Sequence, residues 1–180
     1  PGTWRSGLAQ IVQMTVISVN DITFFVNKKE RIALVGKNGA GKTTLLKVLS
    51  TLAIPDSGMV LIDGQNALTH PLHYRRQLGY MPETVMLYND MLVKEYLYYR
   101  ANLKGEPVKR VRRRVNEATE ICQIANVLYT PIRNLSLGMR KRVALADAIL
   151  LRPRVLLLDD FLAGVDMVMR EDSADILSTV

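Results

Sequence analysis

The 180-residue sequence has few or none of the features that mark disulfide-bonded, membrane-spanning or secreted proteins. Cys122 is the single cysteine, so an internal disulfide is excluded, a reducing cytosol is favoured and a buried structural thiol is expected. No apolar run approaches the roughly 20 residues that span a bilayer, and residues 1–7 contain no apolar stretch of the kind found in signal peptides. Hydrophobic residues make up 48%, which is enough for a packed core, so a disordered chain is not expected.

Basic residues are in excess, because 24 Lys and Arg against 17 Asp and Glu give a net charge of +7. This balance is compatible with nucleic acid, an anionic membrane leaflet or phosphorylated ligands. Much of the excess lies in residues 104–114, where residues 109–114 form a dense basic run. We interpret this run first as the solvated face of a helix and second as a patch for a partner. Charge alone therefore does not select a function.

The sequence is organised around a glycine-rich loop at residues 36–43. The loop follows the apolar run 32–35 and precedes the helical pattern 44–49, which gives the order strand, loop, helix. In this context the pattern G-x-x-x-x-G-K-[ST] predicts a phosphate site and not an ordinary glycine turn. The loop N–H groups would face the phosphates, Lys42 would reach the β- and γ-phosphates, and the Thr43 hydroxyl would ligate Mg²⁺. The predicted nucleotide-binding residues of this segment are Gly36, Lys37, Asn38, Gly39, Ala40, Gly41, Lys42, Thr43 and Thr44.

Strand and helix patterns alternate along most of the chain. Strands are predicted at 11–16, 22–26, 31–35, 59–62, 78–81 and 155–158, and helices at 42–52, 72–77 and 138–150. The pattern from about 84 to 134 is mainly helical and is broken at 105–107. We expect an α/β sheet with its ligand at the carboxyl ends of the strands, and we interpret the helical stretch as an inserted subdomain.

The strand predicted at 155–158 is continuously apolar and ends in two acidic residues. Such a run favours a strand that is buried on both faces of a parallel sheet. Asp159 would then lie at the carboxyl end of the strand, beside the glycine loop, where a carboxylate can hold Mg²⁺, usually through water. Asp160 follows at a point where a general base could orient water toward the γ-phosphate. Apolar strands that end in acidic residues are common, so this prediction depends on the glycine loop.

A third motif begins at Ser136, which is a good N-cap, and Gly138 lies in the first turn of the helix that follows. The apolar stripe of that helix consists of Met139, Val143, Ala146 and Leu150. An ordinary amphipathic helix explains the stripe but not the Ser-x-Gly start. A helix with this start presents N–H groups and a hydroxyl to an anion.

Three segments, in their order, resemble the motifs of ABC-type ATPases. Residues 135–142 (Leu-Ser-Leu-Gly-Met-Arg-Lys-Arg) are similar to the signature motif, which is usually written LSGGQ. Residues 79–83 resemble the Q-loop, and residues 161–166 resemble the segment that ends in the D-loop aspartate. With the glycine loop, the resemblance to an ABC transporter ATP-binding domain extends from about residue 11 to residue 180.

The resemblance implies a P-loop NTPase (RecA-like) α/β core with an N-terminal antiparallel β subdomain and an inserted helical subdomain. Residues 1–180 would form a single ABC ATP-binding domain, with 1–83 and 135–180 as the core and β subdomain and 84–134 as the helical subdomain. The switch histidine of the family would lie past residue 180, so we expect the domain to be C-terminally incomplete. His70 and His73 precede the Q-loop and are expected at the surface.

The resemblance also implies ATP and Mg²⁺ as cofactors and assigns roles to particular residues. The implied catalytic residues are Asp160, Lys42 and Glu83, and those that hold or orient Mg²⁺ are Thr43, Asp159 and Glu83. Further nucleotide-binding residues are Ser136, Gly138 and Asp166. In the family, the signature motif contacts the γ-phosphate held by a second copy of the domain. Two ATP molecules would therefore be held between two domains, which close on binding ATP and open after hydrolysis.

At several positions the sequence departs from the pattern of the family. Asp160 stands where Glu is usual, and a displacement of about 1 Å at a catalytic group can cost on the order of a hundredfold in rate. In the signature motif, Leu137 replaces the first glycine and Met139 replaces the glutamine, while Glu83 at the Q-loop position adds negative charge near the phosphates. No aromatic residue stands near Gln13, where the family stacks the adenine. We therefore predict a site that binds ATP and hydrolyses it slowly.

The leading hypothesis is the ATP-binding and ATP-hydrolysing subunit of an ABC transporter of the export type, peripheral at the cytoplasmic face of a membrane. The expected partners are a second ABC ATP-binding domain, in a homo- or heterodimer, and integral membrane permease subunits, with no nucleic acid. One alternative is a soluble ABC ATPase that acts on nucleic acid or ribosomes, which the net charge of +7 permits. Another is a non-catalytic ATP-dependent clamp, which Asp160 and Leu137 favour.

Overall fold

The computed structural model describes residues 19–161, so the strand predicted at 11–16 lies outside the described residues. Helices and short strands alternate along this part of the chain, with two short 3₁₀ helices labelled η. The elements are α1 (Lys42–Leu49), β1 (Leu61–Ile62), β2 (Gln65–Asn66), α2 (Pro71–Arg75), β3 (Leu78–Met81), α3 (Val93–Leu103), α4 (Val108–Ile121), η1 (Ala125–Val127), η2 (Ile132–Asn134), α5 (Leu137–Ile149) and β4 (Val155–Leu158). No helix among the described residues is long and apolar enough to cross a membrane.

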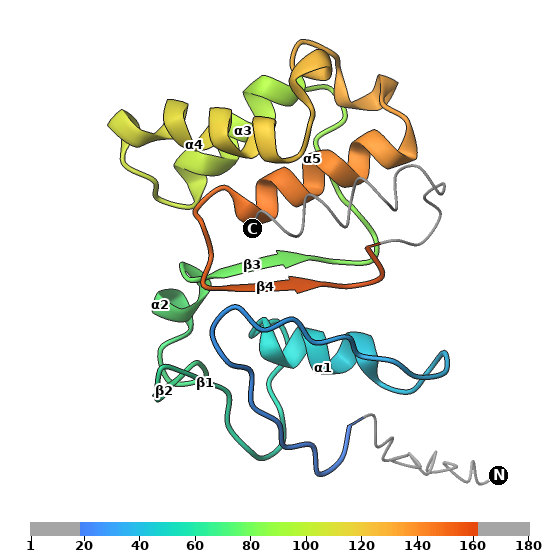
Figure 1. Cartoon of the computed structure of the whole chain (residues 1–180), viewed down its shortest axis with the longest axis vertical. Helices are drawn as coiled ribbons and strands as arrows, with labels where there is room; N and C mark the ends of the chain where they lie inside the picture. The colour runs from blue at the N-terminus through green and yellow to red at the C-terminus, as the bar shows by residue number, and fades with distance from the viewer. Residues whose placement is uncertain (1–18, 162–180) are drawn as a thin grey trace, which may run out of the picture.

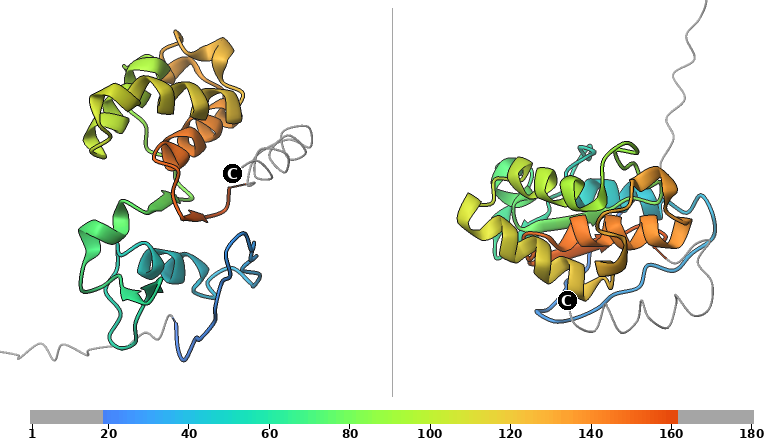
Figure 2. Two further views of the ribbon diagram at one scale, coloured as in Figure 1. Left: turned by 60° about the vertical axis from the view of Figure 1, so that its left-hand side comes forward. Right: turned by 90° about the horizontal axis from the view of Figure 1, so that it is seen from above.

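The elements form layers on either side of two parallel strands (Figure 1). Helices α3 and α4 pack on each other and on α5, and α5 packs on β3. Helix α1 lies on the opposite side of β3 and β4, as Figures 1 and 2 both show. The glycine-loop helix and the helical layer are therefore separated by the strands and α5.

Strands β3 and β4 run parallel and end together, with Leu78 opposite Val155 and Met81 opposite Leu158. The ladder continues one step further, because the Asp159 N–H donates to the Met81 carbonyl at 2.9 Å. Both strands were predicted with these bounds, and the parallel pairing confirms an α/β arrangement. The prediction that 155–158 is buried on both faces is wrong, since all four residues of β4 are only half-buried.

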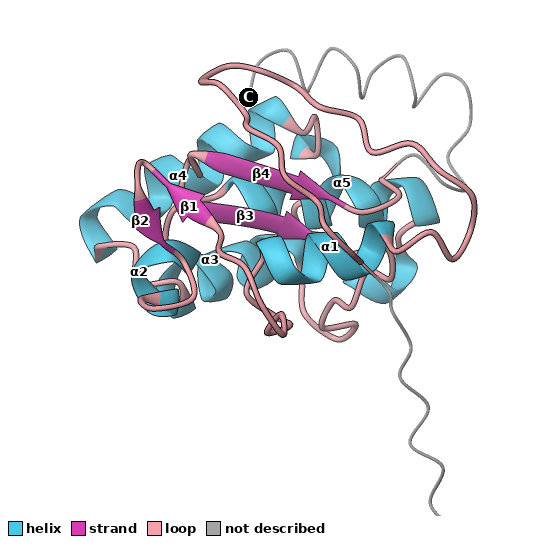
Figure 3. Cartoon of the chain, turned by 90° about the horizontal axis from the view of Figure 1, so that it is seen from below, coloured by secondary structure: helices cyan, strands magenta, loops and turns pink. Residues whose placement is uncertain are grey.

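The strands predicted at 22–26 and 31–35 are not formed, and both segments run as loop (Figure 3). The polar turn predicted between them is present, where the Glu30 N–H donates to the Asn27 carbonyl at 3.0 Å. The apolar side chains of the two segments are exposed, including Phe25 at 85% and Val35 at 94%. A strand needs a hydrogen-bonded neighbour to be stable, and residues 19–161 supply none to either segment. Strand propensity alone therefore misled the prediction.

The strand predicted at 59–62 is shorter than expected and forms half of a hairpin. Strands β1 and β2 pair antiparallel, with Leu61 opposite Asn66 and Ile62 opposite Gln65. Asp63 and Gly64 form the predicted turn with φ of 48° and 77°, the positive values that a two-residue hairpin loop requires. Within residues 19–161, this hairpin is the only antiparallel strand pairing.

Most of the buried core is helical. It joins apolar side chains of α3, α4 and α5 with Met81 of β3. Cys122, at the end of α4, is fully buried in this cluster as expected, and burial raises the pKa of its thiol to about 12. A thiol with such a pKa stays protonated and unreactive at neutral pH.

A half-buried charge cluster ties α3 to α5. Arg100 of α3 and Lys104, which follows α3, form ion pairs of 2.9 and 2.8 Å with Asp147 of α5, and the Tyr96 hydroxyl donates to the same carboxylate at 3.3 Å. Burial by itself raises the pKa of Asp147, but the adjacent Lys104 and Arg100 outweigh it and hold the pKa below its usual value. This cluster was not predicted from the sequence, because its members lie on helices separated in the chain.

The basic run of α4 is the solvated helix face that we expected. Lys109, Arg110, Arg112 and Arg113 are exposed, whereas Val111 and Val115 of the same helix are buried. Arg114 differs from the others, because its side chain is only 13% exposed and lies against Glu106 at 3.2 Å and Glu117 at 3.4 Å.

Gly79 occupies a position in β3 where no side chain fits. A Cβ at this residue would lie 2.5 Å from the Ala148 carbonyl oxygen of α5 and 2.9 Å from side-chain atoms of Leu156 and Pro153. We predict that Gly79→Ala lowers the free energy of unfolding by about 3 kcal/mol, because α5 must move away from β3. Urea denaturation followed by circular dichroism measures this change.

Gly105→Ala is the matched control, because an added Cβ there meets no atom within 4 Å but φ is +81°. In this variant the free energy of unfolding should fall only by the cost of a left-handed alanine, about 1 kcal/mol. Equal losses for the two variants would contradict the close packing of β3 on α5.

Candidate nucleotide-binding site

The glycine loop folds around the end of the Lys42 side chain. The Lys42 ammonium donates to the Gly36 carbonyl at 2.7 Å and the Lys37 carbonyl at 2.9 Å. Gly39 and Gly41 have φ of +80° and +86°, values that L side chains rarely adopt. The loop itself, residues 36–40, is exposed. An anion can therefore approach both the backbone of the loop and the ammonium at its centre.

Helix α1 begins at this loop without any side chain that competes for its first N–H groups. Gly41 is the N-cap, no side chain caps the helix, and its first turn contains no acidic residue. The first four N–H groups of a helix have no partner within the helix. Together with the positive end of the helix dipole, they favour a bound phosphate.

Thr43 and Asp159 lie 116 residues apart in the chain and meet at the carboxyl end of β4. The Thr43 hydroxyl donates to Asp159 Oδ1 at 3.2 Å. Asp159 is only 5% exposed, and its Oδ2 is buried with no hydrogen-bond partner. Burial together with the negative charge of Asp159 also raises the pKa of the neighbouring Tyr80. The predicted position of Asp159 beside the glycine loop is thus observed.

The oxygen atoms of Thr43 and Asp159 fit Mg²⁺, which phosphates and water also coordinate. They do not fit a metal that is held by protein ligands alone. A hydroxyl and a carboxylate oxygen are hard oxygen donors, and Mg²⁺ typically takes one or two protein carboxylates together with phosphates and water. The unpartnered Oδ2 is a buried polar atom that a cation or its water would satisfy. Within residues 19–161 there is no cluster of three or more His, Cys, Asp and Glu residues that could hold a metal.

The two other acidic residues assigned to the site are exposed. Asp160 follows Asp159 and adopts φ of +48°, the left-handed region. Glu83 lies two residues after β3, which ends beside β4. In the described part of the chain, the Glu83 carboxylate makes no hydrogen bond or ion pair, so the structure brings Thr43 and Asp159 together but does not bring Glu83 into contact with them.

Ser136 caps α5 as the sequence predicts. Its hydroxyl accepts from the Met139 N–H at 3.2 Å, and its carbonyl accepts the first helical hydrogen bond from the Arg140 N–H at 2.9 Å. Gly138 lies in the first turn of α5, and Leu137 is 55% exposed. Among residues 19–161, no hydrogen bond joins Ser136 to the glycine loop, so the motif stands apart from the Thr43 site of its own chain. Asp166 lies outside the described residues.

Sequence reasoning missed Lys141, which lies in the second turn of α5. Lys141 is 5% exposed, and its ammonium donates to the carbonyls of Asp160 and Phe161, both at 3.2 Å. The sequence contained one signal of this burial, because Lys141 lies in a predicted helix and most of the residues that follow it in that helix are apolar. A lysine is rarely this buried unless it is paired.

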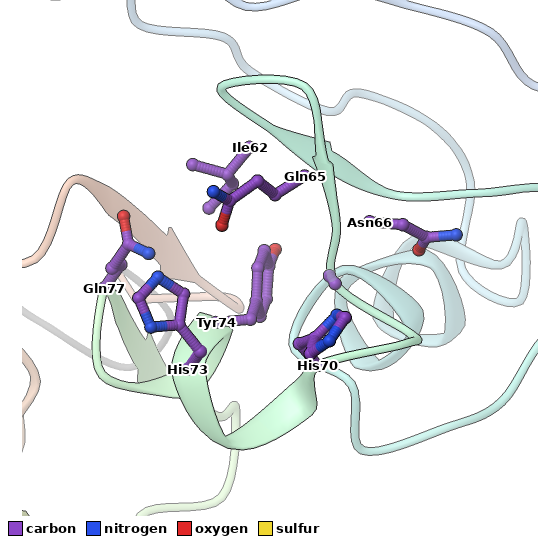
Figure 4. A pocket seen from close by; sticks show the side chains of 8 residues that line it. Ile62, Gln65, Asn66, His70, His73, Tyr74 and Gln77 are labelled. Atoms are coloured by element: carbon purple, nitrogen blue, oxygen red, sulfur yellow. The ribbon is translucent and has the colours of Figure 1, made fainter.

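The hollow between the β1–β2 hairpin and α2 is not a second nucleotide site. His70, His73 and Tyr74 line it together with residues of the hairpin (Figure 4). Its volume of about 10 Å³ holds roughly one water molecule. Both histidines are exposed, which confirms the expectation that they are surface residues. Tyr74 is structural, because its hydroxyl donates to the Leu49 carbonyl at the end of α1 at 2.6 Å.

The geometry around Thr43 and Asp159 defines a P-loop nucleotide-binding protein of the α/β class. A family model described as ABC transporter matches residues 19–163, and the chain belongs to this family. The P-loop α/β fold class expected from the sequence is confirmed by this membership together with the solved structures described below.

The chain is also similar to individual ABC proteins. It is 32% identical over 160 residues to YxlF, an uncharacterized ABC transporter ATP-binding protein of Bacillus subtilis, with 89% of this chain and 52% of the relative covered. It is 34% identical over 155 residues to a sulfate/thiosulfate import ATP-binding protein, CysA, of Gloeobacter violaceus, with 86% and 45% covered. The chain spans about half the length of the curated relatives it matches.

Solved structures show the same similarity. An ATP-binding subunit of an ABC transporter superposes with a TM-score of 0.78 at 30% identity, over 90% of this chain and 68% of that one. CbiO1 from Clostridium perfringens, described as part of the ABC transporter complex cbiONQ, superposes with a TM-score of 0.71 at 27% identity, over 81% and 59%.

The Thr43–Asp159 contact can be tested without nucleotide. We predict that Thr43→Val lowers the free energy of unfolding by about 1–3 kcal/mol in EDTA, because it leaves both oxygens of the buried Asp159 carboxylate without a donor. Urea denaturation measures the loss.

Thr44→Val is the matched control, because the Thr44 hydroxyl makes no hydrogen bond in the described part of the chain. If this variant is destabilised as much as Thr43→Val, the Thr43–Asp159 hydrogen bond does not exist in solution.

Proposed function

We propose that this chain is the ATP-binding and ATP-hydrolysing unit of an ABC transporter. The observation that carries the proposal is the meeting of Thr43 with the buried Asp159 beside an exposed glycine loop, in a chain of the ABC transporter family. The loop N–H groups, the N-terminus of α1 and the Lys42 ammonium would bind the triphosphate of ATP. The remaining nucleotide contacts would come from the residues assigned to the loop by its motif, Gly36 to Thr44.

Mg²⁺ is part of this proposal. Thr43 and Asp159 would hold the ion, with Glu83 at the end of β3 orienting its water shell. When bound, Mg²⁺ neutralises charge on the β- and γ-phosphates. The protein would supply oxygen donors from the first turn of α1 and from the residue that follows β4, and Lys42 would draw the phosphates onto the loop.

We assign the general base to Asp160. Its carboxylate is exposed, one residue beyond the buried Asp159, so water can reach it. The shorter side chain sets it back from the position a glutamate would take, and we expect slow hydrolysis for this reason. Within residues 19–161, the exposed Ser136 cap lies apart from the Thr43 site of its own chain. This separation supports a role of Ser136 and Gly138 in completing the site of a second ABC domain, and we propose the same role for Asp166.

The partners and the location are also proposals. We propose a second ABC ATP-binding domain, permease subunits in the membrane and a peripheral position at its cytoplasmic face. The segment 84–134, with α3 and α4, would act as the helical subdomain that transmits motion to the permease, and 1–83 with 135–180 as the nucleotide-binding core. The names of the relatives support transport but not the export type, since CysA of Gloeobacter violaceus is an import protein.

The slow-site proposal predicts the effect of Asp160→Glu. We expect this variant to hydrolyse ATP about tenfold faster than the wild type, because the longer side chain moves the carboxylate toward the γ-phosphate. Release of phosphate from Mg²⁺-ATP measures the rate.

Asp160→Asn, which keeps the shape but loses the base, is the control and should be inactive while it still binds ATP. Brisk turnover by the wild type that Asp160→Glu fails to improve would overturn the slow site. Tight ATP binding and dimerisation without any turnover would favour a non-catalytic clamp.

The metal assignment predicts the effect of Asp159→Asn. For the wild type we expect ATP to bind more tightly with Mg²⁺ than with EDTA. Asp159→Asn should reduce the affinity for the ion by about 10–100-fold, because an amide is a weaker ligand than a carboxylate. Isothermal titration calorimetry with and without Mg²⁺ separates the metal-dependent part of the affinity. An unchanged difference in Asp159→Asn would refute the assignment.

A further inference from the structure

Lys141 is a buried cation beside the site, and the mechanism proposed above does not use it. Its side chain leaves the second turn of α5 and reaches the turn that follows β4. There the ammonium donates to the carbonyls of two successive residues, Asp160 and Phe161, at 3.2 Å each. Hydrogen bonds from a charged donor are about twice as strong as neutral ones, so this contact can fix the backbone of the turn.

The turn needs such a support because its central residue is strained. Asp160 adopts φ of +48°, and left-handed backbone costs a non-glycine residue roughly 1–2 kcal/mol. On one side, the Asp159 N–H is held by the Met81 carbonyl at 2.9 Å, and on the other side Phe161 is buried in the core. Lys141 binds the segment between these two anchors. The Asp160 carboxylate is exposed, whereas its carbonyl faces α5.

We propose that Lys141 is a positioning residue for Asp160. By binding the two carbonyls, it sets the two peptide planes that follow the Asp160 Cα, and it thereby fixes the backbone from which the carboxylate extends. It acts through the backbone and does not contact the nucleotide. The proposal deepens the proposed function and rests on it, because it takes Asp160 as the general base.

Helix α5 would then serve the site in two ways. Its N-terminus carries Ser136 and Gly138, and its next turn carries the lysine that holds the turn of Asp160. A displacement of α5 along or about its axis would move both features together. A purely structural lysine would stabilise the fold but would have no particular effect on the rate of hydrolysis.

Lys141→Met tests the proposal, because methionine keeps most of the aliphatic stem and removes the donors. We expect kcat for Mg²⁺-ATP to fall on the order of ten- to a hundredfold, since a misdirected carboxylate is displaced by about 1 Å. The Kd for ATP should change by less than about twofold, because no ground-state contact is lost. Lys141→Arg, which keeps a charged donor, should restore most of kcat.

Hydrogen exchange of the peptide that contains residues 159–161 gives a readout that does not depend on activity. We expect faster exchange of this peptide in Lys141→Met and near wild-type exchange in Lys141→Arg. Lys104→Met is the matched control, because it removes a lysine that pairs with Asp147 and has no contact with the turn of Asp160. This control should leave kcat and the exchange of residues 159–161 unchanged.

The proposal is overturned if Lys141→Met leaves either kcat or the exchange of residues 159–161 unchanged, or if ATP binding falls in the same proportion as kcat. It is also overturned if Lys141→Arg restores nothing. If the wild type binds Mg²⁺-ATP but shows no turnover, the proposed function fails, and the exchange experiment alone decides whether Lys141 holds the turn. If Lys141→Met does not fold, Lys141→Gln, which keeps a shorter donor, is judged by the same measurements.

Discussion

The hydrogen bond between Thr43 and Asp159 is the interaction on which the nucleotide site depends. It joins the glycine-loop helix on one side of the strands to the carboxyl end of β4, across 116 residues of sequence. Helix α1 buries little apolar surface of its own, with Leu46 as its one buried apolar side chain. This polar contact therefore sets how the phosphate-binding loop faces the acidic end of the strands. The buried Oδ2 of Asp159 has no hydrogen-bond partner, so a cation bound beside Asp159 would satisfy it.

Helix α5 is the second organising element, because it lies between β3 and the helical layer of α3 and α4. Along its length it carries the Ser136 cap, then Lys141 against the turn of Asp160, and then Asp147 in its ion pairs with α3. These contacts fix polar and charged groups at particular positions along α5, in an interface that is otherwise apolar. An interface of this kind specifies one arrangement of the helices, since a shifted helix would leave buried charges unpaired.

The sequence predicted the features that are encoded locally. The glycine loop, the bounds of β3 and β4, the Asp63–Gly64 turn and the Ser136 cap each depend on a few neighbouring residues, and each is present. The predictions failed where a distant partner decides the outcome. Residues 22–26 and 31–35 have the composition of strands but no neighbour among the described residues, and the partners of Lys141 and Asp147 lie on other elements. The steric limit at Gly79 comes from the carbonyl of Ala148, which no local pattern of β3 reveals.

A crystal structure of the protein with a non-hydrolysable ATP analogue and Mg²⁺ is the most direct test of the central claim. The account predicts the triphosphate on the backbone of residues 36–43, with Lys42 on the β- and γ-phosphates and the ion between the phosphates, Thr43 Oγ1 and the carboxylate of Asp159, directly or through one water. A nucleotide bound elsewhere on the chain, or an ion with neither Thr43 nor Asp159 in its coordination shell or hydrogen-bonded to its water, would contradict it.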